Sequence, residues 1–248
     1  MSSSACKDGL MVFRARQALK KLDWPFALRV YVGLAIFGVL GTFAERFVGP
    51  APVFIERTVS LLMVGCGVAS VLQALGVAPW RWLAALGVGF AAEWVGLATG
   101  LPFGRYEYTG RWWPSVPGPG GSPFPVPLPF AWLMLAGACF VVVRSGRWNR
   151  TMLAPLAGLL AALFDLGMEP VLAGPLGYWK WLEPGPLPGG APILNFFGWW
   201  VTAAVAASLW TARTYEDERT HRRGQVGWVV LITFGVFLWV VGALRGGV

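Results

Sequence analysis

Residues 164–170 read Phe-Asp-Leu-Gly-Met-Glu-Pro, which places two carboxylates, Asp165 and Glu169, four residues apart inside an apolar segment covering residues 151–174. A second apolar segment carries one more acid, Glu93, and no basic residue adjoins any of the three in the sequence. Ionisable groups within hydrocarbon-length segments are costly in a bilayer and usually serve a function. The apolar sequence around these acids therefore decides the fold, and the acids themselves direct the search for a function.

The composition is typical of an integral membrane protein. Hydrophobic residues make up 56% of the chain and charged residues only 13%, with a mean hydropathy of +0.59, whereas soluble domains carry about 25% charged residues. The 15 Trp and 33 Gly agree with this, because Trp favours the membrane interface and Gly permits close helix contact. We expect a single integral membrane domain over residues 1–248.

Seven apolar segments of about twenty residues are each long enough to cross a bilayer as a helix. The sequence therefore predicts an all-α, polytopic membrane bundle of about seven transmembrane helices. We place the spans near residues 26–44, 58–78, 82–101, 126–143, 151–173, 192–212 and 226–244.

The charges outside the spans predict the topology. Residues 1–25 interleave Lys and Arg with apolar residues, which is typical of an amphipathic segment on the cytoplasmic face, although a solvated tail is an equal alternative. With the N-terminus inside, 14 of the 20 Lys and Arg lie on the cytoplasmic side. Because positive charges favour that side, we expect a multi-pass protein of the cell (plasma) membrane with its C-terminus outside.

Two loops on the outer side are rich in proline and aromatic residues. Residues 102–129 contain eight prolines, and residues 174–192 contain five together with the sequence Gly-Tyr-Trp-Lys-Trp. We expect this density of Pro and Gly to prevent regular structure. Such chain can enter a membrane only where protein covers it, so we interpret both loops as caps over the outer mouth of the bundle. An interfacial aromatic belt is the alternative.

The three acids and Asn195 are predicted to lie close to one level beneath these caps. At a rise of about 1.5 Å per residue, Glu93 lies near the middle of its helix, and Asp165 lies in the outer half of its own. Glu169 shares a helix face with Asp165 and precedes Pro170, which should bend or end the helix. Asn195 stands at the outer start of the sixth span, although it could simply bond across helices.

Several functional classes are unsupported by the sequence. The single histidine, His221, argues against His-rich metal sites and axial haem ligation, and no DDxxD-type run suits magnesium diphosphate. The three cysteines form no CxxC motif. Nothing resembles a nucleic-acid module, so the net charge of +8 is better explained by topology. We expect no metal, no cofactor and no nucleic-acid partner.

The acids and their aromatic neighbours favour one kind of chemistry. Desolvation disfavours a carboxylate anion, and carboxyl groups that share a site disfavour it further, so at least one should be a neutral acid able to give up a proton. Aromatic faces can stabilise a nearby cation. The candidates are Trp94, Tyr106, Tyr108, Trp179, Trp181, Trp199 and Trp200. Together these groups suit protonation of an alkene to a carbocation, which water activated by an anionic neighbour could capture.

Other interpretations of the same residues stay open. Buried acids also bind one another, the backbone or water, or line an ion path, as in a proton-coupled transporter. Against a transporter, the sequence shows no obvious inverted repeat. A cyclase or isomerase would also begin with alkene protonation and would differ in admitting no water. A retinal protein is rejected because the last span has no lysine.

Four blocks, taken as an ordered set, resemble the membrane carotenoid hydratases (CruF-type) of the carotenoid biosynthesis protein family. The blocks are Glu93 followed by Gly100-Leu-Pro-Phe-Gly-Arg-Tyr-Glu-Tyr108, then Asp165-x-x-x-Glu169-Pro170, Trp179-Lys-Trp181 and Pro192-Ile-Leu-Asn-Phe-Phe-Gly-Trp199. The resemblance covers about residues 80–210. Where the family has an aspartate before the proline, this chain has Glu169, which keeps the acid and lengthens its reach by a methylene.

The resemblance implies a carotenoid 1,2-hydratase, a lyase that adds water to the terminal double bond of a linear (ψ) end group without a cofactor. The product would be a tertiary 1-hydroxy carotenoid. In this hypothesis Asp165 is the first choice for the proton donor, and Glu93 or Glu169 orients the water. The predicted substrate-binding residues are Tyr106, Tyr108, Trp94, Trp179, Trp181, Asn195 and Trp199. The carotenoid would enter sideways from the membrane lipids, and other carotenoid-pathway enzymes are candidate partners.

Overall fold

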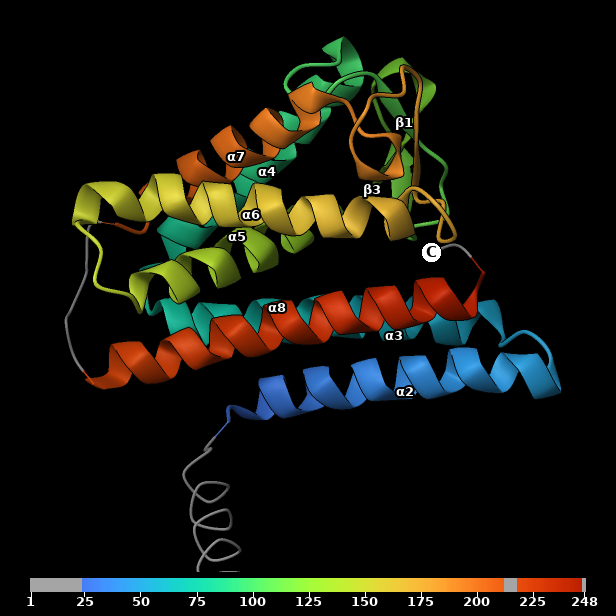
Figure 1. Ribbon diagram of the computed structural model, residues 1–248, viewed down its shortest axis with the longest axis horizontal. Helices are drawn as coiled ribbons and strands as arrows, with labels where there is room; N and C mark the ends of the chain where they lie inside the picture. Colours follow the sequence, from blue (N-terminus) through green and yellow to red (C-terminus); the bar gives the residue numbers. More distant parts are fainter. Residues whose placement is uncertain (1–23, 212–217, 247–248) are drawn as a thin grey trace, which may run out of the picture.

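The computed structural model describes residues 24–211 and 218–246. The described residues form seven helices, one for each predicted span, so the predicted all-α polytopic bundle is confirmed (Figure 1). The predicted amphipathic segment, residues 1–25, lies outside the described residues apart from Trp24 and Pro25. The helices are α2 (Phe26–Val48), α3 (Val53–Leu75), α4 (Pro79–Thr99), α5 (Leu128–Arg144), α6 (Arg150–Leu172), α7 (Ile193–Ser208) and α8 (Glu218–Leu244).

Five of these helices, α2, α3, α4, α6 and the apolar part of α8, are long and apolar enough to cross a membrane by length and composition. The other two, α5 and α7, are shorter, with 17 and 16 residues. Helix α5 lies at the centre of the bundle, where it contacts α3, α4, α6, α7 and α8. Nearly all of its residues are buried, as expected of a helix that is apolar on every side.

Proline and glycine set several helix ends. Helices α2, α3, α5 and α7 each begin directly after a proline, and α4 has Pro79 at its first position. Helices α3 and α4 end at Gly76 and Gly100, both in the left-handed conformation that glycine adopts most readily. Pro170 acts as predicted, because α6 ends two residues later at Leu172.

Small residues let the helices approach closely. A Cβ atom added to Gly158 of α6 would lie 2.3 Å from the backbone oxygen of Trp200 on α7. A Cβ atom on Gly89 of α4 would lie 2.7 Å from the side chain of Trp132 on α5. Membrane bundles often depend on such contacts, because their lipid-facing and core-facing side chains are equally apolar.

The expectation that the two caps lack regular structure is wrong. Strand β1 (Tyr106–Tyr108) of the first cap pairs antiparallel with β4 (Trp179–Trp181) of the second. Strands β2 (Ser115–Pro117) and β3 (Pro123–Pro125) form a hairpin within the first cap. The pattern aromatic-charged-aromatic, repeated in β1 and β4, has the two-residue period of a strand. These short segments therefore form strands although the surrounding sequence is rich in Pro and Gly. The caps lie together at one end of the bundle, near the ends of α4, α6 and α8 (Figure 1).

Candidate active site

Glu93 is buried on the last part of α4 and accepts three hydrogen bonds. The hydroxyl groups of Tyr106 and Tyr108 donate to Oε2 over 2.5 Å and 2.8 Å. The indole Nε1 of Trp132 on α5 donates to Oε1 over 2.8 Å. Burial disfavours the charged form of this carboxyl group, and the three donors on its two oxygens oppose that effect.

Asp165 and Glu169 lie on one face of α6, as their spacing predicts, and Asn195 of α7 bridges them. Its side-chain nitrogen donates to Oδ2 of Asp165 over 2.7 Å and to Oε1 of Glu169 over 3.2 Å. Asp165 is fully buried, and its Oδ1 has no hydrogen-bond partner among the described residues. Two carboxyl groups that share one amide donor in a buried site disfavour a second negative charge.

Strand β4 covers Glu169. The indole nitrogens of Trp179 and Trp181 both donate to Oε2 of Glu169, over 3.2 Å and 3.1 Å. Gly189 packs on the same turn of α6, where a Cβ atom would lie 2.6 Å from the carbonyl carbon of Glu169. The second cap therefore packs directly on Glu169.

The β1–β4 ladder connects the two groups of acids. Tyr106 is paired with Trp181, and Tyr108 with Trp179, so each phenol that binds Glu93 lies opposite an indole that binds Glu169. Burial, followed by the neighbouring Glu93, raises the pKa of Tyr106 and Tyr108 well above the usual range. Both phenols therefore stay protonated and act as donors.

An apolar cavity of about 480 Å³ extends from these acids toward α2, α3 and α8. Glu93, Glu169 and Asn195 line it, whereas Asp165 does not line it and is hydrogen bonded to Asn195, which does. Of the predicted binding residues, the ones that line the cavity are Tyr106, Tyr108, Trp179, Trp181, Asn195 and Trp199. Its volume is within the range of about 300–1,000 Å³ that is usual for small-molecule sites.

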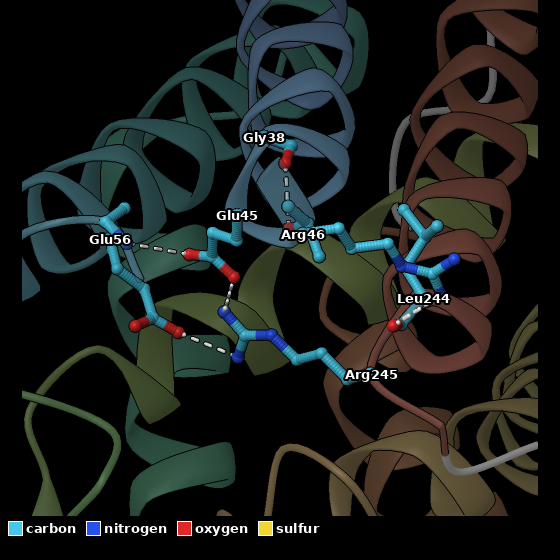
Figure 2. Close-up of polar contacts among 8 residues, drawn as sticks. Gly38, Glu45, Arg46, Glu56, Leu244 and Arg245 are labelled. Atoms are coloured by element: carbon cyan, nitrogen blue, oxygen red, sulfur yellow. Dashed lines mark hydrogen bonds and ion pairs between the residues drawn. The ribbon is translucent and has the colours of Figure 1, made fainter. Parts of the chain in front are cut away.

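One part of the cavity lining is a charged cluster from the ends of α2, α3 and α8. Figure 2 shows Arg245, at the end of α8, between Glu45 of α2 and Glu56 of α3. The guanidinium lies 3.1 Å from Oε1 of Glu56 and 3.8 Å from Oε2 of Glu45. Beside this cluster, Arg46 donates to the carbonyl oxygen of Leu244 over 2.8 Å. These contacts join the ends of three helices around the cavity.

Two predicted aromatic neighbours lie apart from the cavity. Trp94 is 38% exposed and packs on Phe90 and Phe124, because adjacent positions on a helix point about 100° apart and Glu93 takes the inward one. Trp200 also does not line the cavity, and its indole nitrogen donates to the carbonyl oxygen of Pro155.

Trp132 is a site residue that the sequence analysis missed. Besides binding Glu93, its ring stacks on Trp199 with ring centres 3.9 Å apart. One signal could have found it, since a tryptophan inside a fully apolar helix still needs an acceptor for its N–H group. Within the described ranges, including this site, no three His, Cys, Asp or Glu side chains are grouped in a way that could hold a metal ion.

Apolar helices that enclose a cavity with buried acids define the class of this molecule, a multi-span membrane protein with a polar site inside its bundle. Residues 55–247 match the family described as "Carotenoid biosynthesis protein", and the chain belongs to this family. The predicted resemblance is thereby confirmed.

The chain is similar to a protein from Haloarcula japonica named bisanhydrobacterioruberin hydratase. The two are 28% identical over 189 residues, which cover 75% of this chain and 55% of that protein. The chain thus spans about half the length of this curated relative. No solved structure was found to match.

Proposed function

We propose that this protein is a carotenoid hydratase that adds water to the terminal double bond of a linear (ψ) carotenoid end group. One observation carries the proposal: two buried acids with different hydrogen-bond surroundings, Glu93 and Glu169, line the same apolar cavity. The name of the Haloarcula relative supports a hydration reaction in a pigment of this kind. The product would be a tertiary 1-hydroxy carotenoid, and the reaction needs only water.

The proton comes from the pair formed by Asp165 and Glu169. Because both carboxyl groups share the amide of Asn195 in a dry site, a proton held by the pair avoids a second buried charge. From the sequence alone, Asp165 was the first choice for the group that protonates the alkene. Since Glu169 lines the cavity and Asp165 does not, we assign delivery to Glu169 and a supporting role to Asp165.

Proton transfer to the less substituted carbon of the alkene breaks the π bond and leaves a tertiary cation. The stacked rings of Trp132 and Trp199 lie at the cavity near Glu93 and can stabilise this charge. Glu93, whose three short hydrogen bonds favour its anion, accepts a proton from water as the water oxygen bonds to the cation. The acid pair must regain one proton and Glu93 must lose one before the next turnover.

The cavity also suggests how the substrate lies. Its walls include Phe37, Gly38 and Phe237, which come from the α2–α8 side of the bundle. A polyene would pass between these helices from the lipid with its end group toward the acids. In the proposed topology the N-terminus is cytoplasmic, and the caps and the C-terminus are outside the cell membrane.

The test is expression in a lycopene-producing bacterium, followed by mass spectrometry of the extracted pigments. A gain of one water supports a hydratase, whereas an altered pigment of unchanged mass indicates a cyclase or isomerase. Unaltered pigment beside confirmed membrane-inserted protein would contradict the proposal for this substrate class.

Two isosteric variants separate the roles within the pair. Glu169→Gln should abolish hydration, because it removes the acid that faces the substrate. Asp165→Asn should lower hydration severely while the protein remains in the membrane. Full activity in Glu169→Gln with none in Asp165→Asn would reverse the two roles, and full hydration by Asp165→Asn would remove Asp165 from the mechanism.

A further inference from the structure

A second, more polar cavity lies in the caps and meets the apolar cavity at two residues. It has a volume of about 880 Å³ and is lined by the end of α4, strand β1 and parts of both caps. Its lining includes Arg105, Arg111 and Lys180. We name it the cap vestibule. Tyr106 and Tyr108 line both the cap vestibule and the apolar cavity, so the two phenols form the partition between them.

The partition is attached to Glu93. Both phenol oxygens that separate the cavities donate to Oε2 of this one carboxyl group. Gly96 leaves just enough room for this arrangement, because a Cβ atom there would lie 2.8 Å from the hydroxyl oxygen of Tyr106. The chain thus brings a polar space next to the acid that the proposed function makes the base.

The reaction needs water at one point of an otherwise apolar cavity. A polyene lying between α2 and α8 would fill the apolar cavity up to the acids. The cap vestibule reaches the acid end without crossing the substrate. We propose, on the basis of the hydratase function above, that the cap vestibule supplies the reacting water past Tyr106 and Tyr108 to Glu93, so that water and carotenoid reach the acids from opposite sides.

Leu97 offers a way to obstruct this route without changing an acid or a phenol. It lies one turn beyond Glu93 on α4, on the same face, and lines the cap vestibule. Leu97→Trp should narrow the vestibule beside Glu93. Val95→Trp is the matched control, because Val95 is on the same helix turn, is largely exposed and lines neither cavity.

The measurement uses membranes that contain the full chain, with lycopene as substrate and buffer in D₂O. Protonation places deuterium on the alkene carbon, and the cation then either bonds to water or loses a proton from that carbon. The second outcome returns the alkene with deuterium in it and consumes no water, although the acid pair must take its deuterium from the D₂O buffer before each transfer. The ratio of hydrated product to deuterated recovered substrate therefore reports the water supply and does not depend on the amount of folded protein.

For Leu97→Trp we expect this ratio to fall several-fold while deuterium exchange continues, and for Val95→Trp we expect the wild-type ratio. Leu97→Phe, a smaller change, should give an intermediate ratio. It keeps the test possible if the tryptophan variant fails to fold. A wild-type ratio in both Leu97 variants, or a fall in the ratio for Arg245→Gln instead, would overturn the proposal. If the wild-type chain forms no hydrated product, it is the proposed function that fails.

Discussion

The indole of Trp132 on α5 and the carboxyl group of Glu93 on α4 are joined by a hydrogen bond of 2.8 Å between Nε1 and Oε1. The same indole stacks on Trp199 of α7, so one side chain links three helices at the acid end of the cavity. Glu93 is thereby oriented from two sides, with the phenols of β1 on its other oxygen. This arrangement makes Trp132 a positioning residue whose contribution can be measured.

Trp132→Phe should keep most of the ring packing on Trp199 and remove the N–H donor to Glu93. A hydrogen bond to a charged group contributes about 1.5–3 kcal/mol, so we expect hydration to fall by about one to two orders of magnitude. Pigment analysis at equal protein level measures the loss. Trp94→Phe is the control, since Trp94 lies apart from the cavity, and equal losses in both variants would contradict this role for Trp132.

Asn195→Leu replaces the bridging amide by a side chain of similar size without donors. Asp165 and Glu169 then lose the nitrogen that both of them contact. Leaving buried polar groups unsatisfied costs about 1–3 kcal/mol for each group. We expect a lower unfolding temperature in detergent and loss of hydration, with partial recovery in Asn195→Gln. Wild-type stability and activity in Asn195→Leu would show that the bridge is dispensable.

Gly198→Ala tests how closely the first cap must rest on α7. A Cβ atom at residue 198 would lie 2.6 Å from the carbonyl oxygen of Pro102 and 2.7 Å from a ring carbon of Phe103. Such overpacking costs about 1–3 kcal/mol, so the variant should unfold at a lower temperature and hydrate less. Gly65→Ala, with nothing within 4 Å of the added atom, should instead be neutral or slightly stabilising. Equal effects would argue against close cap packing.

The helices and the convergence of the acids could be predicted because both depend on hydrophobic length. Each apolar segment is long enough to specify a helix, and acids such as Asp165 and Glu169 must turn toward the protein interior rather than lipid. Which of these acids lines the cavity could not be predicted. Whether Asp165 or Glu169 reaches the cavity depends on how α6 is rotated against α7, and packing at residues such as Gly158 sets that rotation.

The caps show a second limit of the sequence. Prolines indicated irregular chain, yet the Tyr-Glu-Tyr and Trp-Lys-Trp segments pair across about 70 residues of sequence. Such pairing depends on two distant segments meeting at the end of the bundle, which no local pattern specifies. Trp94 was predicted to bind substrate but does not line the cavity. Composition alone does not say which of two adjacent residues on a helix points inward.

Arg245→Gln should affect stability only slightly. Its side chain is 28% exposed, and its partners Glu45 and Glu56 are 25% and 48% exposed, so solvent screens both ion pairs. Pairs of this kind contribute about 0–1 kcal/mol. We expect a small fall in the unfolding temperature that shrinks as salt is added. Arg105→Gln is the control, because both side chains of its pair with Glu183 are 68% exposed and the pair should contribute less. A large, salt-independent fall in the unfolding temperature of Arg245→Gln would contradict this account.

Tyr178 should make the protein less stable at high pH. Burial, with the nearby Glu56 as a smaller cause, raises the pKa of Tyr178 to about 12 from the ordinary value of 10. Between these values the unfolded chain loses the phenol proton while the folded chain keeps it, so the stability that this residue contributes is full below pH 10 and declines as pH rises toward 12. Tyr178→Phe should make the fall in unfolding temperature between pH 10 and 12 shallower. Below pH 9 the pH dependence of stability should be unchanged, because an ordinary tyrosine with a pKa of about 10 is protonated there. Thermal unfolding in detergent across this range measures the difference, and parallel curves for the two proteins above pH 10 would show that Tyr178 does not titrate as its burial requires.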